Sequence, residues 1–175
     1  MLLGCHLSIK GGFENAFIEV QKLEIDTFEI FTKTQYLWRA KTIALVEAGV
    51  FKKHLKDFDI KIAFSHTQYL VNLASSDSVI REKSILELQG ELLRCNALGL
   101  RYTVLHPGAA KDSTKSQAII NIAKAINLVL RIQVILKVKV LLENTRRARD
   151  QYRLEVGTYF PNFGKSQLKK NGILL

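Results

Sequence analysis

Short apolar runs alternate with longer helical patterns along the first 143 residues, and this alternation most constrains the fold. Apolar runs at residues 3–8, 27–31, 61–65, 102–106 and 138–143 indicate buried strands. Strands separated by helices pack as a parallel sheet with right-handed crossovers. The chain is therefore predicted to be an α/β protein with about five parallel strands and alternating helices. An open doubly wound sheet and part of a (β/α)8 barrel both satisfy the pattern.

Four segments between the strands show apolar residues at three- and four-residue spacing, which is typical of helices that bury one face. Ser113 or Thr114 is placed to cap the fourth of them, because hydroxyl side chains accept hydrogen bonds from the first turn of a helix. The apolar residues that mark the helices are Phe13, Phe17, Val20 and Leu23; Leu45, Val46, Phe51 and Leu55; Val79, Ile85, Leu86, Leu92 and Leu93; and Ile119, Ile122, Ile126 and Leu130.

Length and composition exclude several classes of protein. The chain has 175 residues, of which 47% are hydrophobic and 24% charged, as in one folded domain. Its apolar runs are shorter than the roughly 18 residues that span a bilayer, and its first residues do not resemble a secretory signal. Cys5 and Cys95 form no CxxC pair. We expect both to be small buried side chains in a cytoplasmic protein.

The net charge of +10 is unevenly distributed. Residues 1–145 contain 19 basic and 14 acidic side chains, whereas residues 146–175 contain 7 and 2. A basic balance permits binding to nucleic-acid phosphates. In residues 31–41, Lys33, Arg39 and Lys41 alternate with Tyr36 and Trp38, which suits a nucleic-acid backbone with exposed bases. A loop whose Trp38 packs on the rim of the fold fits this segment equally well.

Histidines and a carboxylate stand at the ends of four expected strands: His6, His66, His106 and Glu143. In a parallel barrel these positions converge at one mouth, and their nitrogen and oxygen donors suit Zn2+, or Mn2+ and Fe2+ with less preference. The alternative for each residue alone is a hydrogen-bonded structural side chain. His54 lies in the helical run FKKHLKDF and is expected at the surface.

Five short segments carry the most specific pattern, and each ends or directly follows an expected strand. They are GCHLSIKGG at residues 4–12, FTKTQYLW at 31–38, HTQYLVNL at 66–73, HPG at 106–108 and ENT at 143–145.

In composition and order, these segments resemble the motifs of the endonuclease IV family of apurinic/apyrimidinic endonucleases. Two positions depart from the family pattern: Thr34 stands where Asn is usual, and Tyr36 where an Arg is common. The resemblance implies an incomplete (β/α)8 TIM barrel and a DNA-repair endonuclease. Members of the family use three zinc ions to hydrolyse the phosphodiester 5′ to an abasic site in double-stranded DNA. No membrane and no protein partner is expected.

Roles for individual residues follow from the same resemblance. His66 and His106 would be ligands of one zinc ion, and Glu143 would bridge it to a second and act as the catalytic carboxylate. Tyr69 and Leu70 would enter the duplex at the lesion. The remaining candidates are Tyr36, which would contact DNA, and His6, which would support the ligands without touching the metal.

The resemblance covers residues 1–145, interpreted as the N-terminal part of the barrel. In the family, ENT is followed by AGQG, whereas RRARD follows here. Permissible codons for residues 146–167, read one base later, encode AGQGTNIGWKLEHIFPILEKVN. We therefore interpret 146–175 as a basic tail translated out of frame, which the nucleotide sequence tests.

This interpretation has consequences for the structure. The first and fifth strands would then be unpaired edges, and at most one or two zinc sites would be partly represented. The remaining metal ligands of the family lie after strands six, seven and eight, which this sequence lacks, so a complete three-zinc site is not expected.

Two other classes stay open. Sugar isomerase and epimerase barrels also place His and Glu at strand ends, and a non-catalytic fragment could bind nucleic acid through its charge and Tyr69 and Leu70. The segments HTQYL and FTKTQYLW favour the nuclease, because a sugar pocket has no need for residues that enter a duplex.

Overall fold

One parallel sheet forms the centre of the molecule. The computed structural model describes residues 1–111, 113–133, 136–143 and 173–174. The strands are hydrogen-bonded in sequence order, as expected for repeated strand–helix units. The predicted fold class is confirmed, with five strands at the predicted places. They are β1 (Gly4–Leu7), β2 (Thr27–Phe31), β3 (Ile62–His66), β4 (Tyr102–Leu105) and β5 (Lys139–Leu142), and a short sixth strand is β6 (Ile173–Leu174).

The sixth strand changes one expectation. β6 pairs with β5 in parallel, with Val140 opposite Ile173 and Leu141 opposite Leu174. The prediction that the fifth strand is an unpaired edge is therefore wrong. The backbone of Ile173 and Leu174 pairs with the edge of β5 that would otherwise have no neighbouring strand. Residues 144–172 and 175, including most of the predicted out-of-frame tail, lie outside the described residues.

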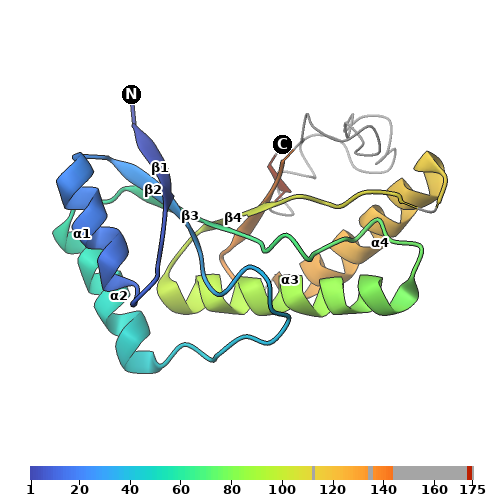
Figure 1. Cartoon of the computed structure of the whole chain (residues 1–175), viewed down its shortest axis with the longest axis horizontal. Helices are drawn as coiled ribbons and strands as arrows, with labels where there is room; N and C mark the ends of the chain where they lie inside the picture. Colours follow the sequence, from blue (N-terminus) through green and yellow to red (C-terminus); the bar gives the residue numbers. More distant parts are fainter. Residues whose placement is uncertain (112, 134–135, 144–172, 175) are drawn as a thin grey trace.

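Four helices alternate with the strands and cover the outer face of the sheet. They are α1 (Glu14–Leu23), α2 (Leu45–Asp57), α3 (Ser78–Leu98) and α4 (Lys115–Gln133). In Figure 1, α1 and α2 stand at the left, α3 runs along the bottom and α4 lies at the right. The Asp77 carboxylate caps α3 by accepting from the Val79 N–H at 2.8 Å. The Thr114 hydroxyl accepts from the Gln117 N–H at 3.3 Å, so the predicted cap of the fourth helix is confirmed.

The core lies between the helices and the outer face of the sheet. Phe17 of α1 packs edge-on against Phe28 of β2 and Phe51 of α2, with ring centroids 5.5 and 5.1 Å away. His54 also contacts Phe17, at 5.0 Å between ring centroids, and is half-buried. The prediction that His54 is a surface residue is wrong, because its turn of α2 faces the aromatic cluster rather than solvent.

Two other sequence-based expectations need correction. Cys95 is buried as predicted, but Cys5 is exposed, because β1 pairs on one side only in the described part of the chain. On α3, Leu86 and Leu93 are 66% and 56% exposed, whereas the charged residues Glu87, Glu91 and Arg94 of this helix are buried. Among the described residues, no helix is long and apolar enough to cross a membrane.

Candidate metal centre

Three residues with metal-binding side chains meet at the carboxyl ends of the central strands. His66 is the last residue of β3, His106 directly follows β4, and Glu143 directly follows β5. The parallel register aligns these ends, since Leu105 lies opposite Leu142. The Glu143 N–H donates to the Leu105 carbonyl at 3.0 Å and continues the ladder by one residue. The sheet therefore brings the three predicted ligands together.

Both imidazoles face the same carboxylate oxygen. His66 Nε2 lies 3.4 Å from Glu143 Oε2, and His106 Nε2 lies 3.6 Å from it. One donor atom from each residue lies within 4.8 Å of the others. The His66 side chain is 7% exposed and the His106 side chain 23%, whereas that of Glu143 is 48% exposed. The group is thus walled by protein on its histidine side and open at the carboxylate.

The hydrogen bond of His66 and the environment of His106 both suit a cation. His66 Nδ1 donates to the Thr67 carbonyl at 2.6 Å, which fixes the ring with Nε2 toward Glu143. Burial lowers the pKa of His106, against the opposing influence of Glu143, so its imidazole favours the neutral form that binds metals. Two imidazole nitrogens and one carboxylate are a donor set that fits a divalent ion of the zinc type.

The loops that carry the candidate ligands His66 and His106 are locked together by Asn72. Its Oδ1 accepts from the Ala74 and Ala109 N–H groups at 3.1 Å each, and its Nδ2 donates to the Ala109 carbonyl at 3.0 Å. Gly108 adopts φ +109° against this amide, and a Cβ there would come within 2.8 Å of Asn72 Cα. The loop after β4, which follows His106, is therefore fixed to the loop that follows His66.

Tyr69 lies at the rim of this centre. Its ring stacks on that of His106, at 6.4 Å between centroids and 16° between planes, and the residue is 60% exposed. Leu70, beside it, is half-buried. Tyr36 is 72% exposed on the loop after β2. Each of the three predicted DNA-binding side chains thus reaches the surface to some extent, and Tyr69 also contacts a predicted ligand.

His6 lies near the centre but bonds elsewhere. Its Nδ1 lies 3.1 Å from Glu29 Oε2, and its ring centroid lies 6.4 Å from that of His66. In the described residues, no hydrogen bond joins His6 to His66, His106 or Glu143. Sequence reasoning did not identify Glu29 as the partner of His6. The available signal is its position in β2, since it alternates with buried Phe28 and Ile30 and so faces the inside of the sheet.

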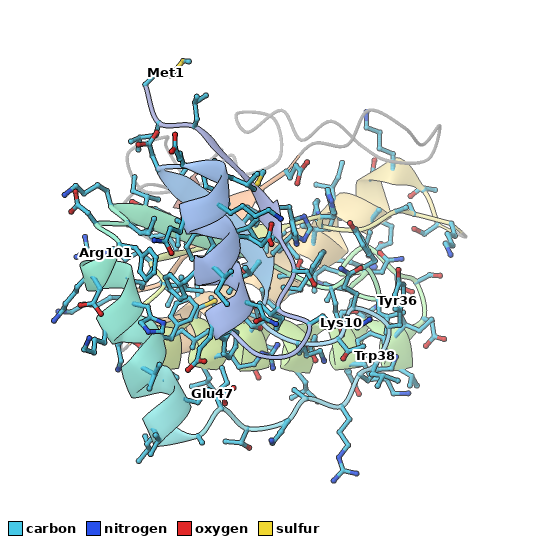
Figure 2. The ribbon with its side chains drawn as sticks, turned by 60° about the vertical axis from the view of Figure 1, so that its left-hand side comes forward. Met1, Lys10, Tyr36, Trp38, Glu47 and Arg101 are labelled. Atoms are coloured by element: carbon cyan, nitrogen blue, oxygen red, sulfur yellow. The ribbon has the colours of Figure 1, made fainter. Side chains whose placement is uncertain are left out.

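A cavity of about 790 Å3 lies between the turn after β1 and the loop after β2. Its wall includes Lys10, Tyr36, Arg39 and Lys41, with Glu47 as an acidic member; Lys10, Tyr36 and Glu47 are labelled in Figure 2. We call it the basic cavity. Lys33 does not present its charge to solvent, because its side chain is 7% exposed and paired with Glu87. Lys33 is among the residues that line the cavity, so a phosphate there would have to compete with Glu87 for its ammonium.

Comparison with known proteins decides the family. A model of the xylose isomerase-like TIM barrel family matches residues 17–159. The chain belongs to this family. A curated relative named probable endonuclease 4, from Chloroflexus aggregans (strain MD-66 / DSM 9485), is 34% identical over 142 residues. The match includes 81% of this chain and 50% of the relative, so the chain spans about half the length of the curated relatives it matches.

Solved structures of similar barrels agree. Endonuclease IV from Thermus thermophilus superposes with a TM-score of 0.75 at 28% identity, over 86% of this chain and 54% of that one. A D-tagatose 3-epimerase-like protein superposes with a TM-score of 0.66 at 15% identity, over 86% of this chain and 55% of that one, which shows a shared fold alone. The resemblance to endonuclease IV predicted from the five segments is confirmed.

Proposed function

We propose that residues 1–145 form the first part of an endonuclease IV-type barrel that acts on double-stranded DNA with abasic sites. The reaction is metal-dependent hydrolysis of a phosphodiester. The observation that carries the proposal is the convergence of His66 and His106 on the Glu143 carboxylate, at 3.4 and 3.6 Å. Relatives named probable endonuclease 4, matched at 33–36% identity, support the same class of enzyme.

His66, His106 and Glu143 are the residues that would hold the metal. Three protein ligands are the usual number at a catalytic zinc site, and two nitrogens with one oxygen are donors that Zn2+ accepts. A bound divalent cation would act as a Lewis acid toward a phosphodiester oxygen and offset its charge. Glu143 is the exposed member, so it is the ligand best placed to meet a substrate or a second cation.

DNA would approach over Tyr69. Because the Tyr69 ring stacks on His106, a nucleotide held against Tyr69 and Leu70 would lie beside the proposed metal ligands. An abasic nucleotide is the easiest to turn out of the helix, since no base pair has to be broken. Lys10, Arg39 and Lys41 in the basic cavity would contact phosphates, with Tyr36 beside them.

Incision of a synthetic abasic duplex, with and without a chelator, tests the function. Cleavage that the chelator abolishes supports the proposal. Binding that falls with salt, without cleavage, would instead favour a non-catalytic nucleic-acid-binding protein.

Zinc binding to this full chain is measured separately by competition with a chromophoric chelator. Glu143→Gln should weaken it, whereas the surface change Glu19→Gln should not. Equal zinc affinity in the two variants would remove Glu143 from the site.

Two further interpretations have their own tests. The interpretation of residues 146–175 as an out-of-frame tail stays a prediction, and it is wrong if no single-base change near the codon of Thr145 restores AGQG. A sugar isomerase or epimerase activity rests only on a shared fold, and conversion of a ketose by the zinc-loaded chain would be needed to support it.

A further inference from the structure

Four charged side chains are buried together beneath the loop that follows β2. Lys33, Glu87, Glu91 and Arg94 are 7%, 8%, 3% and 9% exposed in their side chains. Lys33 Nζ lies 2.7 Å from Glu87 Oε2, and an Arg94 terminal nitrogen lies 2.6 Å from a carboxylate oxygen of both Glu87 and Glu91. Two positive charges therefore balance two negative ones. We call these four residues, with Thr32, the Lys33 network.

The Lys33 network ties the loop after β2 to α3 at two places. The Thr32 hydroxyl donates to Glu91 Oε2 at 2.6 Å and accepts from Arg94 Nε at 2.9 Å. Lys33 Nζ also donates to the Trp38 carbonyl at 2.8 Å, so one ammonium joins both ends of the segment 33–38. Between these ends, Tyr36 is 72% exposed. Arg39 and Lys41 follow closely, and all three side chains line the basic cavity.

Stability alone is a poor explanation for such a group. A buried ion pair contributes little more than a well-packed apolar pair of the same volume, whereas its directional bonds restrict the backbone that carries them. Here the restricted backbone is an irregular loop without helix or strand bonds of its own. Lys33 and Glu87 therefore have the geometry to select one conformation of this loop.

We propose that Lys33 and Glu87 are positioning residues, which fix residues 34–41 and thereby shape the basic cavity for a DNA backbone. The DNA part of this proposal rests on the proposed function. Neither side chain needs to contact DNA, since both are buried where the loop after β2 packs on α3. Their effect on binding comes from ordering Tyr36, Arg39 and Lys41 before the ligand arrives, which removes an entropic cost of binding.

Trp38 makes the proposal testable, because it is the single tryptophan of the chain and its carbonyl accepts from Lys33. Its emission and acrylamide quenching are measured in Lys33→Met. The matched control is Lys53→Met, which removes an exposed lysine paired with Asp57 on α2. We expect a shift to longer wavelength and stronger quenching in Lys33→Met, no change in Lys53→Met, and recovery in Lys33→Arg.

Affinity for a duplex with a synthetic abasic site provides the second readout. We expect Lys33→Met to weaken this affinity about ten-fold, because the cost of ordering the loop side chains is then met on binding. Lys53→Met should leave the affinity nearly unchanged.

Glu87→Gln keeps a hydrogen-bond acceptor and the shape of the side chain but removes its charge. It replaces Lys33→Met if circular dichroism shows that Lys33→Met does not fold. Wild-type Trp38 signals in folded Lys33→Met and Glu87→Gln would overturn the proposal. A wild-type chain that binds no duplex would refute the proposed function, while the Trp38 signals would still decide whether the Lys33 network positions the loop.

Discussion

At the scale of single residues, His106 shows how burial sets the charge of an imidazole. Burial lowers its pKa below the usual 6.5, and neighbouring His66 acts in the same direction, while Glu143 opposes the shift. Below pH 6.5 the unfolded chain therefore takes up a proton that the folded chain resists. This contribution to stability is present above pH 6.5 and is lost as the pH falls through the lower folded pKa.

The predicted result is a urea midpoint that falls between about pH 7.5 and about pH 5.5. In His106→Asn the fall should be smaller, because the titrating group is gone; carboxylates contribute to both proteins and cancel in the comparison. Parallel pH profiles for the two proteins would show that His106 is not perturbed by its surroundings.

The two cysteines differ in exposure, which governs the access of a reagent to the thiol. Cys5 is exposed, whereas Cys95 is buried, with its sulfur 2.9 Å from the Ser65 hydroxyl. Burial, and the nearby Glu91 carboxylate, raise the pKa of the Cys95 thiol. Because the thiolate is the reactive form, we predict that a chromogenic disulfide reagent at about pH 8 labels one thiol in the native protein and two in denaturant. Cys5→Ser should abolish the native reaction, and fast labelling of that variant would contradict the buried position of Cys95.

Sequence reasoning succeeded for residues whose place follows from strand ends. His66, His106 and Glu143 each end or follow an apolar run, and parallel strands bring such positions to one edge. It missed the Lys33 network because hydropathy assigns charged residues to the outside. Glu87, Glu91 and Arg94 neutralise one another and Lys33 only once the loop after β2 has packed against α3. Leu86 and Leu93 are exposed for the same reason, since the opposite face of α3 turns inward.

At the scale of elements, the motifs HTQYLVNL and HPG form the loops after β3 and β4, which Asn72 joins to each other. Gly108 requires a positive φ and has Asn72 in the space where a Cβ would stand. Gly108→Ala should therefore lower the free energy of unfolding by at least about 2 kcal/mol. It should also weaken zinc binding about ten-fold, since displacing His106 moves a proposed ligand.

Gly49 provides the matched control for this prediction. It lies inside α2, is exposed, and has nothing within 4 Å of the place of a Cβ. Gly49→Ala should raise the free energy of unfolding by about 0.5–1 kcal/mol, because alanine loses less backbone entropy in a helix. Urea unfolding of both variants gives the two values. A Gly108→Ala protein as stable as Gly49→Ala would show that the two loops are not locked by Asn72.

At the scale of the whole molecule, the described strands form an open sheet rather than a closed barrel. β1 pairs with β2 and β6 with β5, and in the described part neither outer strand has a second neighbour. Closure is what removes edges in a complete barrel. The inner face of the sheet also bears a hollow of about 450 Å3, lined in part by Phe64, Val104 and Leu141. An open edge next to an apolar face is a known route to association.

Cys5 provides the means to test the role of this edge, because it is an exposed residue of β1. A lysine on an edge strand opposes pairing with another chain, since its charge would have to be desolvated or brought near its copy. We predict that the weight-average molar mass from light scattering rises with concentration in Cys5→Ser and rises less in Cys5→Lys. Both changes remove the thiol, so disulfides through Cys5 cannot explain a difference. Equal scattering would move the association away from β1, and the exposed Leu86 and Leu93 of α3 would then be the surface to change next.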